Sequence, residues 1–406
     1  MRFLLYLAVC VLIMINETVK ADRNNVVGRD SLDFELQDGT RLQLELWFPA
    51  FKPQSKSARH KDYAFSKNLK QALVEVSGMP SMAISTKETS NGFREVVPRP
   101  GRFPLIIFSH GSASFSRQNS RQLEVLAAAG YIVVAPSHPL DSLTTEYRDG
   151  TIVEIDRSQP MLELLGVEAD KKLLKEALGK VSEASAQLRR HKVEEYPEAI
   201  NSFIANTLFI HSVSSAKRRA DHIQQLVRQL IVADPQISAS VLEQADITRI
   251  ALYGHSLGGV ISVLAAESLN TEYLSSNAIR AVVNLDTLQF VLPRETSLEL
   301  VTPTCFVMGG ATKMNKVVIS NLGLNRPFAE NNAQTCEINI AKAAHNNFTD
   351  LTYVTPLKWF GLLGPIKNKH FGKWLEGFLV AYFDSKLKSK AYDYPMWPDA
   401  NLFGTI

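Results

Sequence analysis

The sequence predicts an α/β fold with a mostly parallel central sheet, helices on both faces and a helical insertion. Two short runs, at residues 104–108 and 131–135, are wholly apolar, as expected of parallel strands that are buried on both sides. A helix pattern at residues 117–129 joins them into a right-handed βαβ unit. A third run, at residues 249–253, is rich in strand formers and leads into the motif around which the chain is organised.

That motif is GHSLG at residues 254–258, followed by an apolar helix start at residues 260–266. Strand, G-x-S-x-G and helix in this order are the pattern of a nucleophile elbow. The two glycines avoid clashes with the crossing backbone, while the tight turn holds Ser256 in a strained conformation. Negative charge on a tetrahedral intermediate is favoured at the positive end of the following helix. We therefore predict that Ser256 is a nucleophile rather than the buried serine of an ordinary turn.

Length and composition favour a globular protein. The chain has 406 residues, of which 45% are hydrophobic and 21% charged, as in soluble globular proteins. The formal net charge of +3 is small and evenly spread, and no basic run is interleaved with aromatics, so no nucleic-acid partner is expected. No repeat recurs at a fixed period. One α/β catalytic domain over residues 22–406 accounts for the chain.

The N-terminus has the pattern of a secretory signal peptide over residues 1–21. Arg2 supplies a positive charge, residues 3–15 are apolar, and Ala21 ends a small-residue cleavage site. The apolar run is too short to span a bilayer comfortably; an uncleaved anchor is the alternative. A secreted or periplasmic location is expected. Export would permit a disulfide between Cys305 and Cys336, each at the start of a predicted strand, but two free thiols remain open.

Other elements follow from periodicity. Alternation at residues 33–36 and 41–48 predicts an edge β-hairpin, which Pro49 is expected to end. A short helix is expected at residues 68–76, and Pro136 is expected to end the strand at 131–135. Later strands are predicted at residues 279–285, 304–308 and 337–341. A final helix, expected to pack on the sheet, follows from i, i+3, i+4 spacing of Phe371, Trp374, Leu375, Phe378, Leu379, Tyr382 and Phe383.

Residues 146–215 are predicted to form a helical insertion before the nucleophile strand. One helical face is apolar from residue 173 to 181, and a second stripe runs from residue 220 to 230. A cap over the active site is the functional interpretation. The alternative is that the helix at residues 218–232 is simply the crossover that packs on the sheet.

A serine nucleophile needs a base and an acid that orients it. These arise after later strands, in the order serine, acid, histidine. His345 is the only histidine of the nine that closely follows the last strand. The loop at residues 309–312 holds no carboxylate, so the acid is predicted to be Asp286, at the end of the strand before it. Asp350 is too close to His345 in sequence to orient its ring, and Asp141 would break the order.

The oxyanion hole is predicted from two backbone amides. One is the N–H of Leu257, directly after the nucleophile, and the other is the N–H of Ser112, in the loop after the strand at residues 104–108. Gly111 would let this loop approach the substrate.

These motifs resemble a known family. The segments FSHG at 108–111, GHSLGG at 254–259, LD at 285–286 and HNNFTD at 345–350 are similar to those of the secreted (plasma-type) platelet-activating factor acetylhydrolases. They also resemble bacterial relatives in the wider dienelactone hydrolase-like group, although dienelactone hydrolases proper use a cysteine where Ser256 stands. The similarity runs from about residue 41 to the final helix. Residues 138–141 depart from the animal enzymes, and the insertion has no match.

The resemblance implies an α/β-hydrolase fold, a Ser256-Asp286-His345 triad, no metal and no cofactor. It also implies hydrolysis of esters with short acyl chains, with phospholipids among the candidate substrates. An acyltransferase or a lipase- or polyester-type hydrolase would use the same triad, and a non-catalytic binding protein is a further alternative.

Substrate contacts are expected from His110, Gly111, His255, Phe348 and Trp359. Trp359 belongs to an apolar loop at residues 357–366, which would form an acyl pocket, touch a lipid surface or pack under the final helix. The glycosylation sequon at residues 347–349 is interpreted as accidental, because a glycan there would obstruct the site.

Overall fold

The computed structural model describes ten segments of the chain, and the predicted signal peptide lies outside them. None of the helices in these segments combines the length and the apolar character needed to cross a bilayer. The described residues are 25–52, 66–84, 92–165, 170–238, 240–273, 278–294, 296–355, 358, 361–391 and 394–406.

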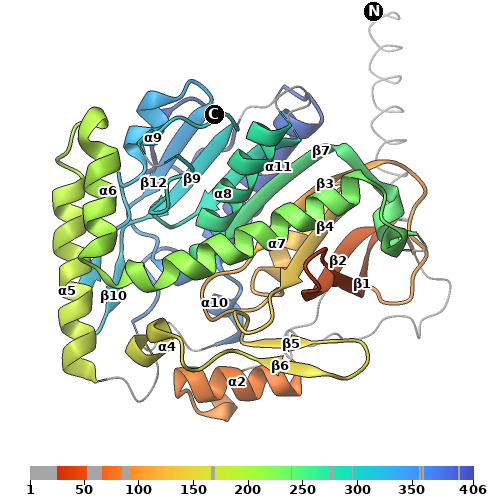
Figure 1. The fold of residues 1–406 in the computed structure, drawn as a ribbon, viewed down its shortest axis with the longest axis horizontal. Helices are drawn as coiled ribbons and strands as arrows, with labels where there is room; N and C mark the ends of the chain where they lie inside the picture. The colour runs from red at the N-terminus through yellow and green to blue at the C-terminus, as the bar shows by residue number, and fades with distance from the viewer. Residues whose placement is uncertain are drawn as a thin grey trace, which may run out of the picture.

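A mixed, mostly parallel sheet forms the centre of the fold (Figure 1). Six neighbouring strands, from β4 to β12 in sheet order, run parallel, and β1, β2 and β13 are antiparallel to their neighbours. The predicted α/β class is confirmed. In sheet order the strands are β1 (Asn25–Glu35), β2 (Arg41–Phe51), β4 (Ile132–Ser137), β3 (Phe103–Ser109), β7 (Ala245–His255), β8 (Ile279–Leu285), β9 (Thr304–Gly309), β12 (Thr335–Ile340) and β13 (Asn401–Gly404).

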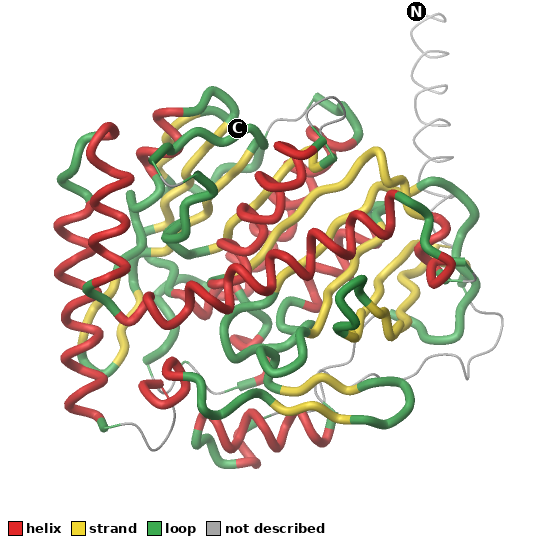
Figure 2. The backbone as a smooth tube through the Cα atoms, in the orientation of Figure 1, coloured by secondary structure: helices red, strands yellow, loops and turns green. Residues whose placement is uncertain are grey.

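Helices cover both faces of this sheet. Alternate residues of β3 show the division: Leu105 and Ile107 join the apolar cluster that contains α7 (Val213–Ile231) and α8 (Leu257–Glu272). Ile106 and Phe108 join the cluster that contains α3 (Ser120–Ala128) and α11 (Asn368–Leu387). Figure 2 shows α7 and α8 crossing the near side of the sheet. The predicted final helix and its packing on the sheet are therefore confirmed.

Two prolines do not end their strands as expected. β2 continues through Pro49, opposite Val27, and β4 continues through Pro136, opposite Leu44. At Pro136, β4 is already past its pairing with β3, which covers 132–134, so a missing N–H is tolerated on that side. At Pro49, β2 is past its pairing with β4, which covers 43–47, and the segment at residues 97–99 bonds there instead, with the carbonyl of Pro49 accepting from the N–H of Arg99 at 2.9 Å. Both expectations were therefore wrong.

The helical region before the nucleophile strand divides into two parts, the predicted insertion and the helix that follows it. α5 (Lys171–Leu188) and α6 (Tyr196–Ala205) lie side by side at one end of the sheet (Figure 1), and η5 (Leu208–Ser212) follows them. α7 packs on α8 and the sheet. It is therefore the crossover helix that was the alternative interpretation of residues 218–232. α5 also contacts the ribbon of β10 (Thr312–Met314) and β11 (Val317–Ile319), where Ser182 Oγ donates to the carbonyl of Val318 at 3.0 Å.

The smaller elements complete the described chain. α2 (Lys67–Ser77) appears where a short helix was predicted, and it packs in a separate apolar cluster. The remaining described elements are η3 (Ser81–Ala83), β5 (Thr144–Glu146), β6 (Ile152–Glu154), α4 (Pro160–Leu165), η4 (Val193–Glu195), η6 (Pro235–Ile237), η7 (Val241–Gln244), α9 (Arg326–Asn331), η8 (His345–Phe348) and α10 (Leu351–Val354).

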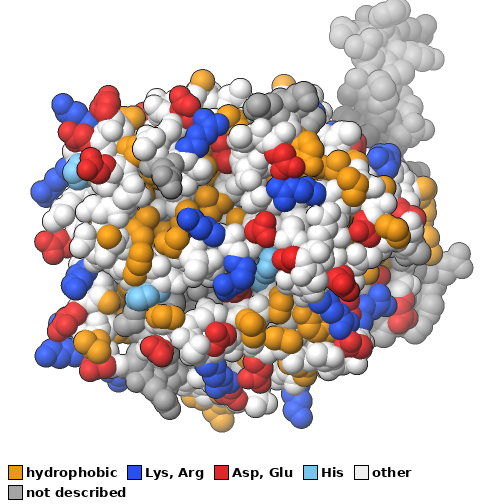
Figure 3. Space-filling model, viewed as in Figure 1, with side chains coloured by type: hydrophobic (Ala, Val, Ile, Leu, Met, Phe, Trp, Pro, Cys, Tyr) orange, Lys and Arg blue, Asp and Glu red, His pale blue; other side chains and the backbone are white. Residues whose placement is uncertain are grey.

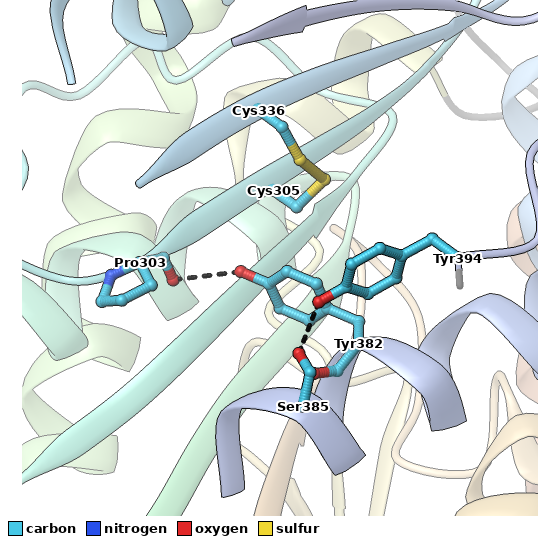
Figure 4. Close-up of a disulfide and its surroundings, with 6 residues drawn as sticks. All are labelled: Pro303, Cys305, Cys336, Tyr382, Ser385 and Tyr394. Carbon is cyan, nitrogen blue, oxygen red and sulfur yellow. Dashed lines mark hydrogen bonds between the residues drawn. A yellow bond between two sulfur atoms is a disulfide. The ribbon is translucent and has the colours of Figure 1, made fainter. Parts of the chain in front are cut away.

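Cys305 and Cys336 form a disulfide between β9 and β12. The two residues are directly opposite in the parallel register. Figure 4 shows the bond near Tyr382 of α11, whose hydroxyl donates to the carbonyl of Pro303 at 3.3 Å. The structure thus decides between the two alternatives left by the sequence.

Candidate active site

Ser256 lies at a strained turn between β7 and α8. Its backbone has φ 57° and ψ −130°, a conformation that costs free energy in a non-glycine residue. A Cβ atom on Gly254 would lie 2.2 Å from the carbonyl oxygen of Gly258, and one on Gly258 would lie 1.9 Å from the carbonyl oxygen of Ser109. Only glycine fits at either position, so the turn has the close backbone crossing expected of a nucleophile elbow.

Asp286 and His345 meet beside this turn. Asp286 follows β8 and is fully buried, and its Oδ2 lies 2.8 Å from Nδ1 of His345. Its Oδ1 accepts hydrogen bonds from the backbone N–H of Gly309 at 2.6 Å and from Nδ2 of Asn321 at 3.1 Å. The loop that carries no carboxylate therefore contributes a donor to the acid instead. One oxygen of Asp286 is fixed, and the other is left for the histidine.

The backbone of His345 is held from two sides. Its N–H donates to Oγ1 of Thr312 at 2.8 Å. Its carbonyl oxygen lies 3.0 Å from Nε2 of His255, and the two rings pack with centroids 4.4 Å apart. Asp350, the neighbouring carboxylate, instead accepts from the N–H of Arg121 at 2.7 Å, at the start of α3. Asp350 thus serves a helix terminus, and Asp286 is the carboxylate that contacts the ring of His345.

The loop after β3 lies against the nucleophile. A Cβ atom on Gly111 would lie 3.3 Å from Cβ of Ser256. The N–H of Gly111 donates to Oε1 of Gln118 at 2.9 Å and is therefore not free for a substrate. Ser112, the next residue, lines the same cavity as Ser256 and Leu257. Leu257 is the first residue of α8, so its N–H is one of those that a helix start leaves unpaired.

A mainly apolar cavity of about 180 Å³ opens above these residues. Ser256, Asp286 and His345 all line it. Leu178 and Val181 of α5 form part of the wall, so the insertion does border the site. In Figure 3, hydrophobic side chains gather left of centre, in the region where Figure 1 places α5 beside the sheet. The other apolar side chains on the wall are Leu208, Phe209, Phe290, Met314 and Ile319.

The sequence of the chain matches a known family over most of its length. The model of the family described as platelet-activating factor acetylhydrolase, isoform II, matches residues 31–371. The chain belongs to this family. It is therefore a carboxylic ester hydrolase of the serine type, as the resemblance implied.

Comparison of structures adds the fold. A ferulic acid esterase from Streptomyces cinnamoneus is similar, with a TM-score of 0.60 and 17% sequence identity. The similarity covers 93% of this chain and 94% of the esterase. At this identity it shows the α/β-hydrolase fold alone.

Three residues that were expected to touch substrate lie below the cavity wall of this acetylhydrolase-family protein. His110 and Phe348 are fully buried and His255 almost so, and none of the three lines the cavity. Direct contact was therefore wrong for all three. Trp359 lies outside the described residues.

The buried histidines hold other groups in place. Nδ1 of His110 lies 2.7 Å from the carbonyl oxygen of Gly111, and Nε2 lies 2.8 Å from Oγ of Ser142. Burial lowers the pKa of His110 well below its ordinary value, and burial followed by the nearby His345 does the same for the pKa of His255. Both rings are therefore neutral. Since Nε2 of Gln118 donates to Nδ1 of His255 at 2.8 Å, Nε2 of His255 carries the proton that it donates to His345.

The sequon asparagine also has an internal role. Asn347 is buried, and its Oδ1 accepts from the N–H groups of Ala344 at 2.7 Å and Gly364 at 2.9 Å. A side chain that is occupied in this way is unsuited to carry a glycan.

Sequence reasoning missed Gln118, Arg219, Thr312 and Asn321. Arg219 did leave a signal, because it lies on the apolar stripe of α7, four residues before Ile223. Gln118 and Asn321 stand in loops and Thr312 begins the three-residue strand β10, so none of the three shows periodicity, and their partners are distant in sequence. Within the described residues, no three His, Cys, Asp or Glu side chains are grouped so that they could hold a metal ion.

Proposed function

We propose that this protein is a secreted serine esterase that cleaves short-chain esters through a Ser256-His345-Asp286 triad and an acyl-enzyme. The observation that carries the proposal is the 2.8 Å contact between Asp286 Oδ2 and His345 Nδ1, at a cavity that Ser256 also lines. A carboxylate only accepts hydrogen bonds, so Nδ1 of His345 carries the proton and Nε2 is the basic nitrogen.

The reaction then follows two steps of acyl transfer. His345 takes the proton of Ser256 as Oγ attacks the ester carbonyl, and the carbonyl oxygen becomes an oxyanion that the N–H groups of Leu257 and Ser112 stabilise. The ester bond breaks as His345 returns the proton to the departing alcohol. Water, deprotonated by His345, next attacks the acyl-enzyme, and the acid leaves as Ser256 regains its proton.

The volume of the cavity supports the proposal that the substrates carry short acyl groups. A dry apolar cavity of roughly 150 Å³ is large enough to bind benzene, and the cavity here is about 180 Å³. We therefore expect acyl chains of up to about six carbons. The family name points to acetyl esters, and esters resembling platelet-activating factor, which pair a short acyl chain with a lipid alcohol, belong to the proposed range.

The central test is Ser256→Ala, measured by hydrolysis of p-nitrophenyl acetate and by labelling with a fluorophosphonate. We expect loss of labelling and a rate at least about 10³-fold lower. The rate that remains would come from the oxyanion hole and from substrate binding. Ser268→Ala is the matched control, because Ser268 lies in the helix that follows Ser256, is exposed and donates to Gln224. Retention of most of the rate in Ser256→Ala would end the proposal.

The proposal that the protein is exported rests on two observations. Residues 3–15 are apolar behind Arg2, and the Cys305–Cys336 disulfide is typical of oxidising compartments. We expect the protein outside the inner membrane of a bacterial host, with Asp22 as its first residue by N-terminal sequencing. A protein that stays in the cytoplasm with Met1 in place would contradict this.

Contact with a lipid surface is proposed on the apolar residues near the cavity. Leu173 of α5, Ile210 of η5 and Val318 of β11 are exposed, and all three elements border the cavity. Single aspartate substitutions at these positions should weaken binding to phosphatidylcholine vesicles while leaving p-nitrophenyl acetate hydrolysis unchanged. Equal vesicle binding by wild type and all three variants would argue against such contact.

A further inference from the structure

Arg219 of α7 is a buried cation without an ion-pair partner among the described residues. Its side chain is fully buried. The nearby Asp141 is held by Arg218, which binds it through three contacts of 2.8 to 3.0 Å. Burial lowers the pKa of Arg219 to about 10, which leaves it charged at neutral pH. An unpaired buried charge is expensive, so a compensating role is expected.

The donors of Arg219 reach the loop beside the nucleophile. Nη2 donates to the carbonyl of His110 at 2.6 Å, and Nη1 is 3.4 Å from the carbonyl oxygen of Gly111. The ring of His110 donates to the same Gly111 oxygen, at 2.7 Å. Two consecutive carbonyls of the loop thus point towards the guanidinium.

Peptide planarity gives this arrangement a consequence. In a trans peptide the C=O and the N–H point in opposite directions. With the carbonyl of His110 on Arg219, the N–H of Gly111 points away, and it does donate to Gln118 on the other side. By the same rule, the N–H of Ser112 points away from Arg219 and His110. Ser112 lines the cavity together with Ser256, so this N–H is directed to where an oxyanion would form.

We propose that Arg219 is a positioning residue for the oxyanion hole. Its guanidinium holds the carbonyls of His110 and Gly111 so that the amide of Ser112 faces the reacting ester. This inference rests on the proposed serine esterase function. The charge also acts through the peptide it orients: the negative end of the dipole meets the guanidinium, and the positive end meets the oxyanion. Such preorganised dipoles act strongest where water is excluded.

The test compares Arg219→Met and Arg219→Lys with Arg228→Gln. Arg228 is a matched control on the same helix, because it pairs with Glu272 at the surface. Each variant is assayed for kcat and KM with p-nitrophenyl acetate. Each is also titrated with an alkyl trifluoromethyl ketone, which forms a tetrahedral adduct with a serine, and with the matching methyl ketone, which binds without forming one.

For Arg219→Met we expect kcat and trifluoromethyl ketone affinity to fall by the same factor, about 10- to 100-fold. KM and methyl ketone affinity should stay within about twofold, because ground-state binding does not use the hole. Arg219→Lys keeps the charge but cannot reach both carbonyls, so its loss should be intermediate. Arg228→Gln should match wild type.

The proposal is overturned if Arg219→Met keeps wild-type kcat and adduct affinity. It is equally overturned if both ketones weaken together, since Arg219 would then shape the cavity rather than the oxyanion hole. If Arg219→Met does not fold, Arg219→Lys decides by itself through the difference between the two ketones. An active Ser256→Ala variant would instead reject the esterase function, so the two failures are distinct.

Discussion

Asp286 is the residue whose assignment depended most on the order of the strands. Asp286 contacts the ring of His345, whereas Asp350 accepts from an N–H at the start of α3. In Asp286→Asn, the amide oxygen takes the place of Oδ1, which accepts from Gly309 and Asn321. The amide NH2 then faces Nδ1 of His345 in place of an acceptor and stabilises the wrong tautomer. We expect kcat with p-nitrophenyl acetate to fall by about 10³- to 10⁴-fold.

Asp350→Asn is the matched comparison. It replaces the acceptor for the N–H of Arg121 and should lower the midpoint of thermal unfolding slightly while kcat stays within about threefold. A larger loss of kcat in Asp350→Asn than in Asp286→Asn would reverse the assignment.

At the scale of elements, the sequence predicted the buried strands because their character is local. The strand at residues 279–285 has the predicted limits, and the apolar stripe of α11 lies on the sheet as expected. The predicted strand ends at Pro49 and Pro136 were wrong, because whether a strand tolerates proline depends on which neighbour is paired there. That information lies in the sheet order and not in the local sequence.

The candidate site divides in the same way. Ser256, Asp286 and His345 each follow a strand, so topology alone predicts that they meet. Gln118, Arg219 and Asn321 position that machinery through contacts across 137, 109 and 35 residues of chain. The burial of His110, His255 and Phe348 could not be foreseen, because closeness in sequence to a proposed site residue does not determine which way a side chain points.

α5 supports a prediction about acyl length. Leu178 lies on the cavity wall, and Leu178→Trp would fill part of a space of about 180 Å³. We expect kcat/KM for p-nitrophenyl hexanoate to fall at least about tenfold while the acetate value stays within about threefold, since one lost methylene contact alone changes discrimination by about 10- to 200-fold.

Leu173→Trp is the control for this change. Leu173 lies on the same helix but is exposed, so its replacement should leave both rates alone. If hexanoate and acetate fall together in Leu178→Trp, the acyl chain does not occupy this cavity.

At the scale of the whole molecule, the disulfide links strands far from the reacting groups. Cys305 and Cys336 lie near the starts of β9 and β12, whereas the triad gathers at the opposite ends of the strands. The bond closes a sequence separation of 31, for which chain entropy gives about 3 to 4 kcal/mol of stability. Replacing both cysteines with alanine should lower the free energy of unfolding by this amount in urea and leave kcat unchanged. A loss of kcat in the folded double variant would contradict this separation.

Glu337 connects the stability of the molecule to pH. It is fully buried on β12 and accepts from the N–H groups of Gly323 at 2.7 Å and Asn325 at 2.6 Å. Gly323 and Asn325 belong to the same loop as Asn321, which donates to Asp286. Burial outweighs the hydrogen bonds and raises the pKa of Glu337 to about 7 from an ordinary value of 4.5.

The sign of the pH effect follows from this raised pKa. Between about pH 4.5 and 7 the folded protein keeps a proton on Glu337 that the unfolded chain has lost, so stability from this group is complete below that range and declines as the pH rises through it. The decline is at most ~1.4 kcal/mol per pH unit, the limit for one proton. Glu337→Gln cannot titrate, so the difference in free energy of unfolding, wild type minus variant, should fall from pH 5 to pH 7 and level off near pH 8. Urea titrations at each pH measure it, and a difference that stays constant or rises would show that Glu337 is ionised in the folded protein throughout.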